Sequence, residues 1–466
     1  MCYGVQAGSK ISHIDIRDIA AVEVKTLTKD GHEGKAYRLK VPSRYTPPMS
    51  LAPRAPGSSA LRPILLTFLA TTIVLHAWMF FSLRREIVTG YADFTIFYTA
   101  GKCVHEGRGL QLYDLETQFA FQRSFAPEVK HRENALPFNH PPFEALLFVP
   151  LAGLPYVTAY LVWAVFNIAL ILGFWTLLRP CLPSLHHFLP ALPLLAMFAF
   201  FPAIIALLQG QDSILLLFLY GLAFSALATG RAFVAGLCLG LALFKFQLVL
   251  PFVVVLLVRR QWKAVAGFTF TAFVLLLVSA AVVGWNGVMA YPRFVLRLNR
   301  SAARAGIYPR DMPNLRGLVA GSLHVAGVPA ILLIVTLSFA LVALVVRWWH
   351  VQPGDKFELG FSLCLAVTII ISYHLLVHDL SVLMLPILLL AELLVAGQIV
   401  GPARRILLAS LAALFLTPVY AVLQFWLREM NLMVTVVAMF AAGIAIALTS
   451  KRESASVDKP AAQSAM

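Results

Sequence analysis

The sequence predicts an all-α protein, a polytopic transmembrane helical bundle of about twelve spans with a long first outer loop. Of its 466 residues, 60% are hydrophobic and only 13% are charged, whereas soluble domains carry about 45–50% apolar and about 25% charged residues. The apolar residues form continuous runs such as residues 331–346, which favours helices over the alternating strands of a membrane β-barrel.

Three regions follow from this composition. Residues 1–60 form a polar tail that we expect in the cytoplasm, either disordered or, if translation begins at Met49, largely an artefact of the gene model. Residues 61–450 hold all the apolar runs and form one transmembrane domain. Residues 451–466 are small and polar, so they are predicted to be a disordered tail.

The first span is predicted at residues 61–83, and the polar segment 84–141 follows it. Further apolar runs follow, and a second polar segment, residues 285–323, lies between two of them. These runs cover residues 142–154, 156–178, 188–208, 213–229, 232–258, 264–284, 327–346, 357–372, 380–396, 406–425 and 432–448.

The run 232–258 leaves two arrangements open. It can cross the membrane once, in which case residues 142–154 must cross as well. Alternatively, it forms a hairpin of two short helices that meet near Lys245, and residues 142–154 lie on the outer surface. The hairpin is preferred because it places Arg179 and Arg231 on the cytoplasmic side. Either arrangement gives twelve spans with both termini in the cytoplasm.

Orientation follows from the basic loops. Arginine and lysine clusters at residues 259–263, 404–405 and 451–452 are expected on the cytoplasmic side, which places both long polar segments on the opposite face. The net charge of +15 therefore fits a membrane protein, and we expect no nucleic-acid partner. The five cysteines show no metal-site spacing and no disulfide framework.

Three polar positions close to span ends are candidates for chemistry. Asp93 follows the first span by a few residues, where partial exclusion of water makes a carboxylate a better general base; the alternative is a solvated loop residue or a helix N-cap. Lys245 interrupts an apolar run, so it marks either a functional site or a structural ion pair. Gln209 to Asp212 break two apolar runs, as a substrate contact or as a simple turn.

Two further groups have the same ambiguity. His374, His378 and Asp379 cluster at a span end, and the two histidines would share a face if that stretch were helical. Two such ligands do not make a metal site, and we expect no bound metal. Arginines at 293, 297, 300 and 304 would form one stripe on a helix, facing lipid headgroups or a lipid phosphate, or else water.

Six motifs in order resemble the integral-membrane glycosyltransferases of family 87, over about residues 61–386. They are Asp93 after the first span, Leu-Tyr-Asp at 112–114, Asn-His-Pro-Pro-Phe at 139–143 leading to the prolines at 150 and 155, Gly210-Gln211, the glycine-rich run 236–245 ending in Lys245, and His378-Asp379-Leu380. The outer segment reads Asn-Leu-Arg at 314–316 where the family has Asn-x-Ser.

The resemblance implies a GT-C-class enzyme of the cell membrane, such as a bacterial inner membrane, that resembles polyprenyl-phosphate-mannose-dependent α-1,2-mannosyltransferases. The donor would be a polyprenyl-phosphate sugar and the acceptor a glycan or glycolipid, with membrane lipids as further partners and no other cofactor. Asp93 would be the base of an inverting transfer, and Lys245 or an outer arginine would stabilise the leaving phosphate. The implied substrate-binding residues are Gln211, Lys245, His374, His378, Asp379, Asn139, His140, Asn314, Arg297 and Arg300.

One rival function is compatible with the same residues. A transporter or flippase of a lipid-linked or small anionic substrate would also need intramembrane Lys and His side chains, and would be built from repeats with broken helices. A transfer assay with a labelled polyprenyl-phosphate sugar separates the two.

Overall fold

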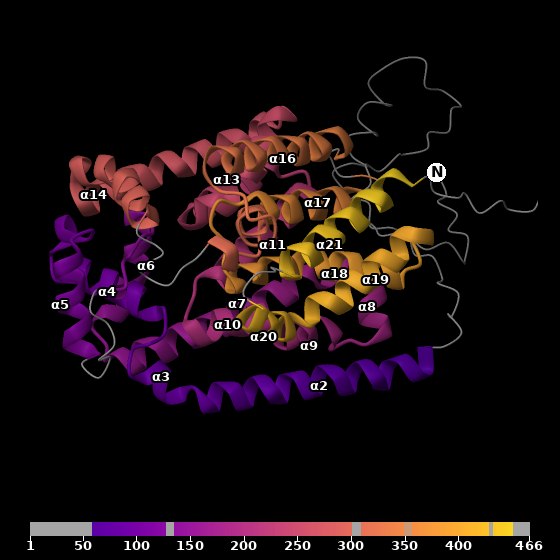
Figure 1. The fold of residues 1–466 in the computed structure, drawn as a ribbon, viewed down its shortest axis with the longest axis horizontal. Helices are drawn as coiled ribbons and strands as arrows, with labels where there is room; N and C mark the ends of the chain where they lie inside the picture. Colours follow the sequence, from indigo (N-terminus) through magenta and orange to yellow (C-terminus); the bar gives the residue numbers. More distant parts are fainter. Residues whose placement is uncertain are drawn as a thin grey trace, which may run out of the picture. The chain divides into compact units, whose positions relative to one another are not determined.

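A computed structural model of the chain describes residues 58–126, 135–300, 309–349, 351, 354, 356–427 and 432–450. Within these ranges the regular secondary structure is helical throughout (Figure 1), as the sequence predicted. Residues 1–57 of the predicted cytoplasmic tail and the predicted C-terminal tail 451–466 lie outside the described residues.

Seven helical runs among the described residues have the length and apolar composition to cross a membrane, or up to nine if two bent pairs each count as one span. The predicted total of about twelve is therefore not confirmed. The difference lies in three apolar runs that form shorter helices, at Pro142–Ala152, Ser213–Ala228 and Phe357–Ile371. The seven are Leu61–Ser82, Tyr156–Cys181, Ala232–Val258, Trp262–Leu298, Gly327–Trp348, Val377–Val395 and Leu432–Thr449.

Two predicted spans are broken by sharp bends. Helices α9 (Leu192–Ala199) and α10 (Phe201–Gln209) meet at 62°, and α19 (Gly401–Phe415) and the described part of α20 (Thr417–Leu427) meet at 66°. In the first pair Phe200 is extended (φ −82°, ψ 106°) and a proline occupies the first turn of α10, where its missing N–H is tolerated. The apolar run therefore continues through a change of direction.

The run around Lys245 does not form the preferred hairpin, so that prediction is wrong. Helices α12 (Ala232–Leu241) and α13 (Phe246–Val258) are joined by the short 3₁₀ segment η4 (Ala242–Lys245) into one candidate span of 27 residues. The alternative arrangement is not confirmed either, because 142–152 is short. Eleven residues of helix reach about 16 Å, whereas the hydrocarbon core is about 30 Å thick.

The first polar segment is folded rather than an open loop. It contains α3 (Arg84–Val88), α4 (Phe94–His105), η1 (Gly109–Gln111) and α5 (Leu115–Phe125), followed by η2 (Pro142–Glu144) and α6 (Ala145–Ala152). A separate apolar cluster holds it together, in which Phe97 stacks on Phe148 at 4.8 Å between ring centroids. At Gly101 a Cβ atom would lie 2.6 Å from the Phe148 carbonyl oxygen, so α4 and α6 approach each other closely.

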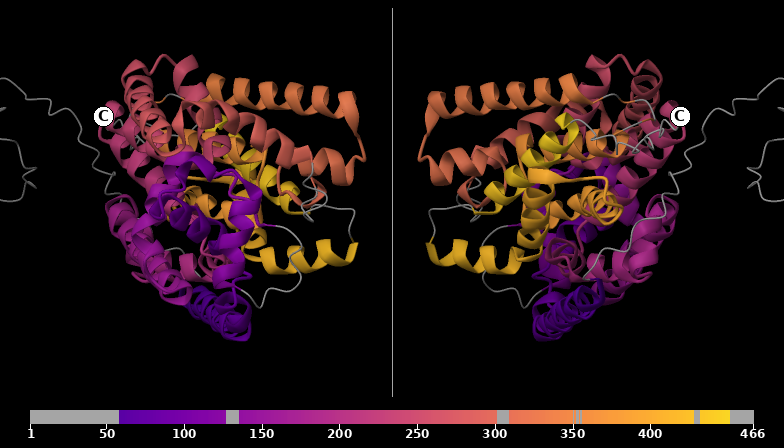
Figure 2. Two further views of the ribbon diagram at one scale, coloured as in Figure 1. Left: turned by 90° about the vertical axis from the view of Figure 1, so that its left-hand side faces the viewer. Right: turned by 90° about the vertical axis from the view of Figure 1, so that its right-hand side faces the viewer.

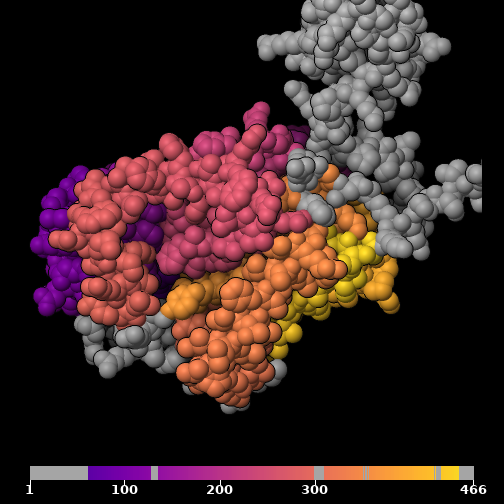
Figure 3. All heavy atoms as spheres, turned by 90° about the horizontal axis from the view of Figure 1, so that it is seen from above, coloured from indigo at the N-terminus to yellow at the C-terminus, as the bar shows by residue number. Residues whose placement is uncertain are grey.

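Helix α14 (Trp262–Arg300) joins the membrane helices to this polar segment. It kinks at Gly284, whose backbone (φ 70°, ψ 165°) is open mainly to glycine. Its first part packs tightly on α12, where a side chain at Gly236 would collide with the Ala264 carbonyl. Its second part covers the polar segment, with the Tyr291 and Tyr113 rings 5.3 Å apart. Figure 3 shows α14 lying across the indigo and purple residues of that segment.

Burial divides the membrane helices into inner and outer ones. In the most apolar stretch of each candidate span, 83% of Val377–Val395 is buried inside the protein. The corresponding share is only 6% for Gly327–Trp348 and 11% for Leu61–Ser82. Helix α16 (Gly327–Trp348) lies along the edge in both views of Figure 2, and α2 (Ser58–Ser82) packs mainly on α9. Outward apolar sides on these two helices suit contact with lipid tails.

The inner helices surround the main apolar core. They are α10, α11 (Ser213–Ala228), α17 (Phe357–Ile371) and α18 (Met384–Val395), and the 3₁₀ segment η8 (Val377–Leu383) packs on α10 and α11. The remaining elements are α7 (Tyr156–Leu178), η3 (Arg179–Cys181), α8 (Pro183–Phe188), η6 (Pro309–Asp311), α15 (Leu315–Gly317), η7 (Leu318–Ser322) and α21 (Leu432–Thr449).

Candidate active site

Residues 209–213, which we call the 209–213 loop, run from the last residue of α10 to the first residue of α11 and form the centre of the candidate site. Helix α10 is capped at its C-terminal end by Gly210, which is in the left-handed conformation (φ 65°). A Cβ atom at this position would lie 2.7 Å from Cβ of Phe94. Glycine is therefore required both for the backbone angle and for the close approach to α4.

This approach brings Asp93 to the loop. Asp93 is half-buried and directly precedes α4, but its side chain makes no capping bond to that helix, which argues against the N-cap interpretation. Instead Gln211 Nε2 donates a hydrogen bond of 2.8 Å to Asp93 Oδ2. Gln211 itself is 5% exposed, so the carboxylate is held by a buried amide from another part of the chain.

Lys245 lies on the other side of the loop and is fully paired. Its side chain is buried, and Nζ lies 2.8 Å from both Asp212 Oδ1 and Ser213 Oγ. A short ion pair also joins Nζ to Asp379 Oδ1. A buried ammonium needs such partners, and they come from the 209–213 loop and from η8. The ion-pair interpretation of Lys245 is thus the one that its contacts support.

His378 and Asp379 complete the buried group from η8. The Gln209 amide oxygen lies 3.0 Å from His378 Nδ1, and because an amide oxygen only accepts, Nδ1 carries the proton. Asp379 Oδ2 accepts a 3.0 Å bond from the backbone N–H of Leu376. The loop therefore contacts Asp93, Lys245, His378 and Asp379, four of the residues that the sequence predicted.

His374 occupies a different position from the one expected. Residues 372–376 are not helical, so His374 and His378 do not share a helical face and that premise is wrong. Burial lowers the pKa of His374 to about 4, which leaves the ring neutral at pH 7. Nearby, Asn314 caps α15 by accepting from the Gly317 N–H at 2.9 Å and donates to the Ser372 carbonyl. Asn314 thus fastens the second polar segment beside His374.

Two further carboxylates lie in this region: Glu144, which sequence reasoning missed, and Asp212, which it named only as part of the polar break at residues 209–212. Glu144 and Asp212 are 2% and 0% exposed, and His140 Nδ1 lies 2.8 Å from Glu144 Oε2 and 3.7 Å from Asp212 Oδ2. Burial raises the pKa of Glu144. Burial alone would lower the pKa of His140, but the two carboxylates outweigh it and raise that pKa. For Glu144 the sequence did contain a signal, because this residue is a lone acid at the start of an apolar run.

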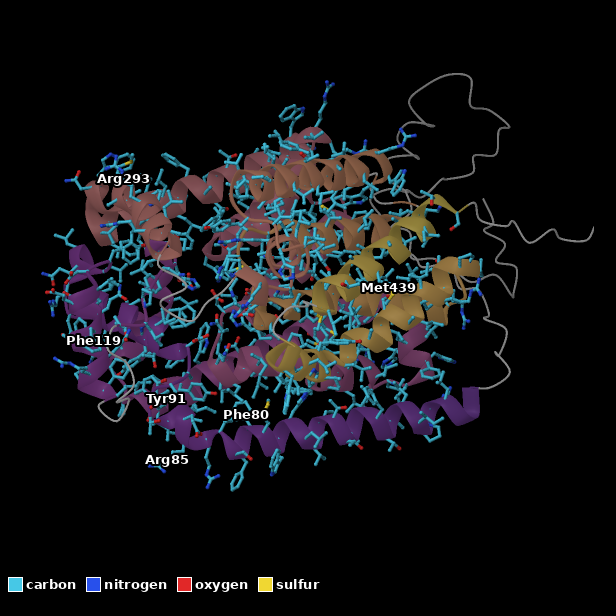
Figure 4. All side chains as sticks on the ribbon, viewed as in Figure 1. Phe80, Arg85, Tyr91, Phe119, Arg293 and Met439 are labelled. Atoms are coloured by element: carbon cyan, nitrogen blue, oxygen red, sulfur yellow. The ribbon has the colours of Figure 1, made fainter. Side chains whose placement is uncertain are left out.

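Three predicted residues lie outside the buried group. The Asn139 side chain is exposed, and its carbonyl accepts a bond from Tyr291. Arg293 and Arg297 are exposed on the second part of α14, and Arg293 points outward from the helix (Figure 4). The side chain of Arg300 and all of Arg304 lie outside the described residues.

Comparison with known proteins identifies the chain at the level of a family. No curated protein and no solved structure is detectably similar to it. The model of glycosyltransferase family 87 matches residues 138–377, which is more than half of the chain. This stretch contains the 209–213 loop, His140, Glu144 and Lys245. His378 directly follows it and Asp93 lies before it, and both are joined to it by the contacts above. The chain therefore belongs to glycosyltransferase family 87 and is a membrane glycosyltransferase.

Proposed function

We propose that this enzyme transfers a sugar, mannose or another hexose or pentose, from a polyprenyl-phosphate donor to a glycan or lipid-linked acceptor on the non-cytoplasmic face. Asp93 is the general base in this proposal. The observation that carries it is the 2.8 Å bond from Gln211 to Asp93, because it ties a half-buried carboxylate to the buried polar group inside the family match.

The reaction uses one oxygen of Asp93. Gln211 occupies Oδ2, and no described residue donates to Oδ1, so Oδ1 is the atom that takes the proton of the acceptor hydroxyl. The hydroxyl oxygen then forms a bond to the anomeric carbon while the bond from that carbon to the phosphate oxygen breaks. The leaving polyprenyl phosphate carries away the electron pair as a stable anion. Attack opposite to the leaving group inverts the anomeric centre.

The developing negative charge on the phosphate requires a cation. Lys245 is a weak candidate because Asp212 and Asp379 already balance its charge. Arg316 is a better one. It is half-buried, its guanidinium lies over the Tyr373 ring at 4.9 Å, and it acts electrostatically on His374. An arginine fork also matches phosphate geometry. We therefore assign the phosphate to the side of the site formed by residues 314–316 and 373–374.

Asp114, the acid of the Leu-Tyr-Asp motif in the same polar segment, has a structural role. Asp114 is the exposed N-cap of α5, and its Oδ2 accepts a 2.9 Å bond from the Thr117 N–H. Hydrogen bonds from Thr117 lower the pKa of Asp114, which makes it a poor base near neutral pH. Asp93 has neither the capping bond nor the exposure of Asp114.

The rival function as a flippase receives some support from the two broken helix pairs, which transporters often contain at their substrate sites. Membership of a glycosyltransferase family favours transfer of the sugar over movement of the lipid. A labelled donor distinguishes them, because transfer moves label from the lipid phosphate to an acceptor, whereas flipping leaves it attached.

The decisive experiment measures sugar transfer from a radiolabelled polyprenyl-phosphate sugar by purified protein in lipid nanodiscs. Asp93→Asn keeps the size and hydrogen-bonding capacity of the side chain but cannot accept a proton, so turnover should fall by at least about 10²-fold. Glu116→Gln, an exposed carboxylate in the same polar segment, is the matched control and should retain full turnover. Near-normal transfer by Asp93→Asn would remove Asp93 from the mechanism.

A further inference from the structure

The buried group around Lys245 contains more negative charge than the described lysine can balance. Glu144, Asp212 and Asp379 are each at most 2% exposed, and Lys245 is the ammonium that contacts two of them. A buried carboxylate without a partner is strongly destabilising. At least one additional positive charge therefore belongs near Glu144, carried either by protons or by a metal ion.

The atoms around Glu144 are close together but are not aligned for hydrogen bonding. His140 Nδ1 and Glu144 Oε2 are 2.8 Å apart, a hydrogen-bond distance, yet neither atom has an aligned partner among the described residues. The same is true of the second Glu144 oxygen. These buried atoms therefore lack the hydrogen-bond partners that burial normally requires.

Asp212 faces His140 with the oxygen that Lys245 leaves unused. Its Oδ1 lies 2.8 Å from Lys245 Nζ, whereas Oδ2 lies 3.7 Å from His140 Nδ1. One donor atom from each of His140, Glu144 and Asp212 lies within 4.8 Å of the others. Donors about 2.0–2.2 Å from a shared zinc ion would be separated by roughly 3–3.6 Å, so small side-chain adjustments suffice to bring all three to one ion.

We propose that His140, Glu144 and Asp212 bind a divalent cation. One imidazole nitrogen with two carboxylate oxygens suits Zn²⁺ or Mn²⁺ better than Ca²⁺ or Mg²⁺, which prefer oxygen ligands alone. Three protein ligands leave a coordination position for water or for an oxygen of a ligand. The sequence indicated no metal, because Glu144 and Asp212 meet only when α6 and the 209–213 loop are folded together.

The position of this ion gives it a structural consequence. His140 lies at the end of the first polar segment and Glu144 in η2 directly after it, whereas Asp212 belongs to the 209–213 loop. The ion would join the two beside Gln211, the residue that holds Asp93. It therefore acts as a positioning element for the candidate base, and its presence does not depend on which sugar is transferred.

The test measures metal directly. Full-length protein with an affinity tag free of histidine is treated with EDTA, dialysed, and loaded with ZnCl₂ or MnCl₂ before metal analysis by mass spectrometry. Wild-type protein should retain about one ion per chain, with an increased thermal transition temperature. Glu144→Gln should weaken zinc binding by more than about tenfold, since even outer-shell partners of a metal contribute 10–100-fold.

The controls are His105→Ala and Glu116→Gln, both exposed in the first polar segment, which should bind metal as the wild type does. If Glu144→Gln does not fold, Co²⁺ loading of the wild-type protein provides the answer, because nitrogen- and oxygen-bound Co²⁺ gives a visible absorption spectrum distinct from that of aqueous Co²⁺. Wild-type protein with no retained Zn²⁺ or Mn²⁺ and no such spectrum would overturn the proposal and leave protons as the balancing charge.

Discussion

The 209–213 loop and the second part of α14 are the two polar regions that the sequence predicted to meet the substrate, and they have opposite properties. In the loop, Gln211 and Asp212 are at most 5% exposed, and each contacts a charged residue from another element. On α14, Arg293 and Arg297 are exposed, and their helix contacts the polar segment through the aromatic residues Tyr291 and Phe294.

The difference shows that the number of charges in a motif is a poorer guide to its importance than the partners that its residues contact in the folded protein. Four arginines at helical spacing are conspicuous in a sequence, but exposed charges interact weakly through water. The loop has only two amides, one acid and one serine, and yet it contacts Asp93, Lys245, His378 and Asp379 because it is short and buried. Mutations in these two regions should therefore have effects of very different size.

The largest effect is expected for Lys245→Met, which removes the cation between Asp212 and Asp379. Both carboxylates would stay buried without their partner, a change that costs about 3–5 kcal/mol. The free energy of unfolding, measured by SDS titration in lipid–detergent micelles, should decrease by that amount. Arg293→Met on α14 is the control and should change it by less than about 0.5 kcal/mol. Equal effects of the two variants would contradict the distinction drawn here.

Gly210→Ala should have the next largest effect. Alanine at a left-handed position costs about 1–2 kcal/mol, and the new methyl group would also collide with Phe94, at about 1–3 kcal/mol. Gly230→Ala has a similar backbone angle (φ 75°) with no atom within 4 Å, so it reports the backbone cost alone. If both variants lose the same stability in the SDS titration, the contact between the loop and α4 has no energetic importance.

Gln211→Leu tests the link to Asp93 without disturbing the ion pairs. A hydrogen bond to a charged group contributes about 1.5–3 kcal/mol, so turnover should fall by roughly 10–100-fold while the KM for the donor stays similar. Gln111→Leu removes an exposed amide that bonds Arg108 and should have no effect on transfer. A rise in KM with unchanged kcat would instead make Gln211 a substrate-binding residue.

The smallest effect is expected for the double variant Arg293→Gln and Arg297→Gln. If these arginines face lipid headgroups or the donor phosphate, the KM for the lipid donor should rise by about 2- to 30-fold, because two exposed ion pairs contribute about 0.2–1 kcal/mol each. The increase should shrink at high salt, and stability should not change. Kinetics identical to the wild type at low salt would show that this stripe is a solvated surface.

Much of the fold could be predicted because apolar runs dictate where membrane helices lie. The helices coincide with the predicted runs, but the lengths of individual spans do not. Proline and glycine positions indicate that a helix changes direction without giving the angle, so the bends before Pro202 and at Gly284 were not predicted. The helical run through Lys245 shows the converse, since a buried charge need not reverse the chain when a partner such as Asp379 is present.

The candidate site was predictable where one residue is unusual in its own segment. Lys245 and Asp379 interrupt apolar sequence. Because a charged side chain in such a segment is energetically costly, its presence indicates a functional or paired residue. Glu144 has the same signal but lies beside a proline-rich stretch that could be interpreted as a surface loop. Its pairing with His140, four residues earlier, is local, but its closeness to Asp212 depends on elements far apart in the sequence, and local patterns contain no information on that packing.

The length of the 209–213 loop constrains how the protein can change. Each residue advances an α-helix by about 100°, since a turn contains 3.6 residues. Only residues 210–212 separate α10 from α11, so an insertion that is absorbed by either helix would turn Gln211 away from Asp93 or Ser213 away from Lys245. The turn at Gly153, where a side chain would meet no atom within 4 Å, has no such restriction. Chain-length variation that is harmless at the turn should abolish the enzyme when it occurs in the loop.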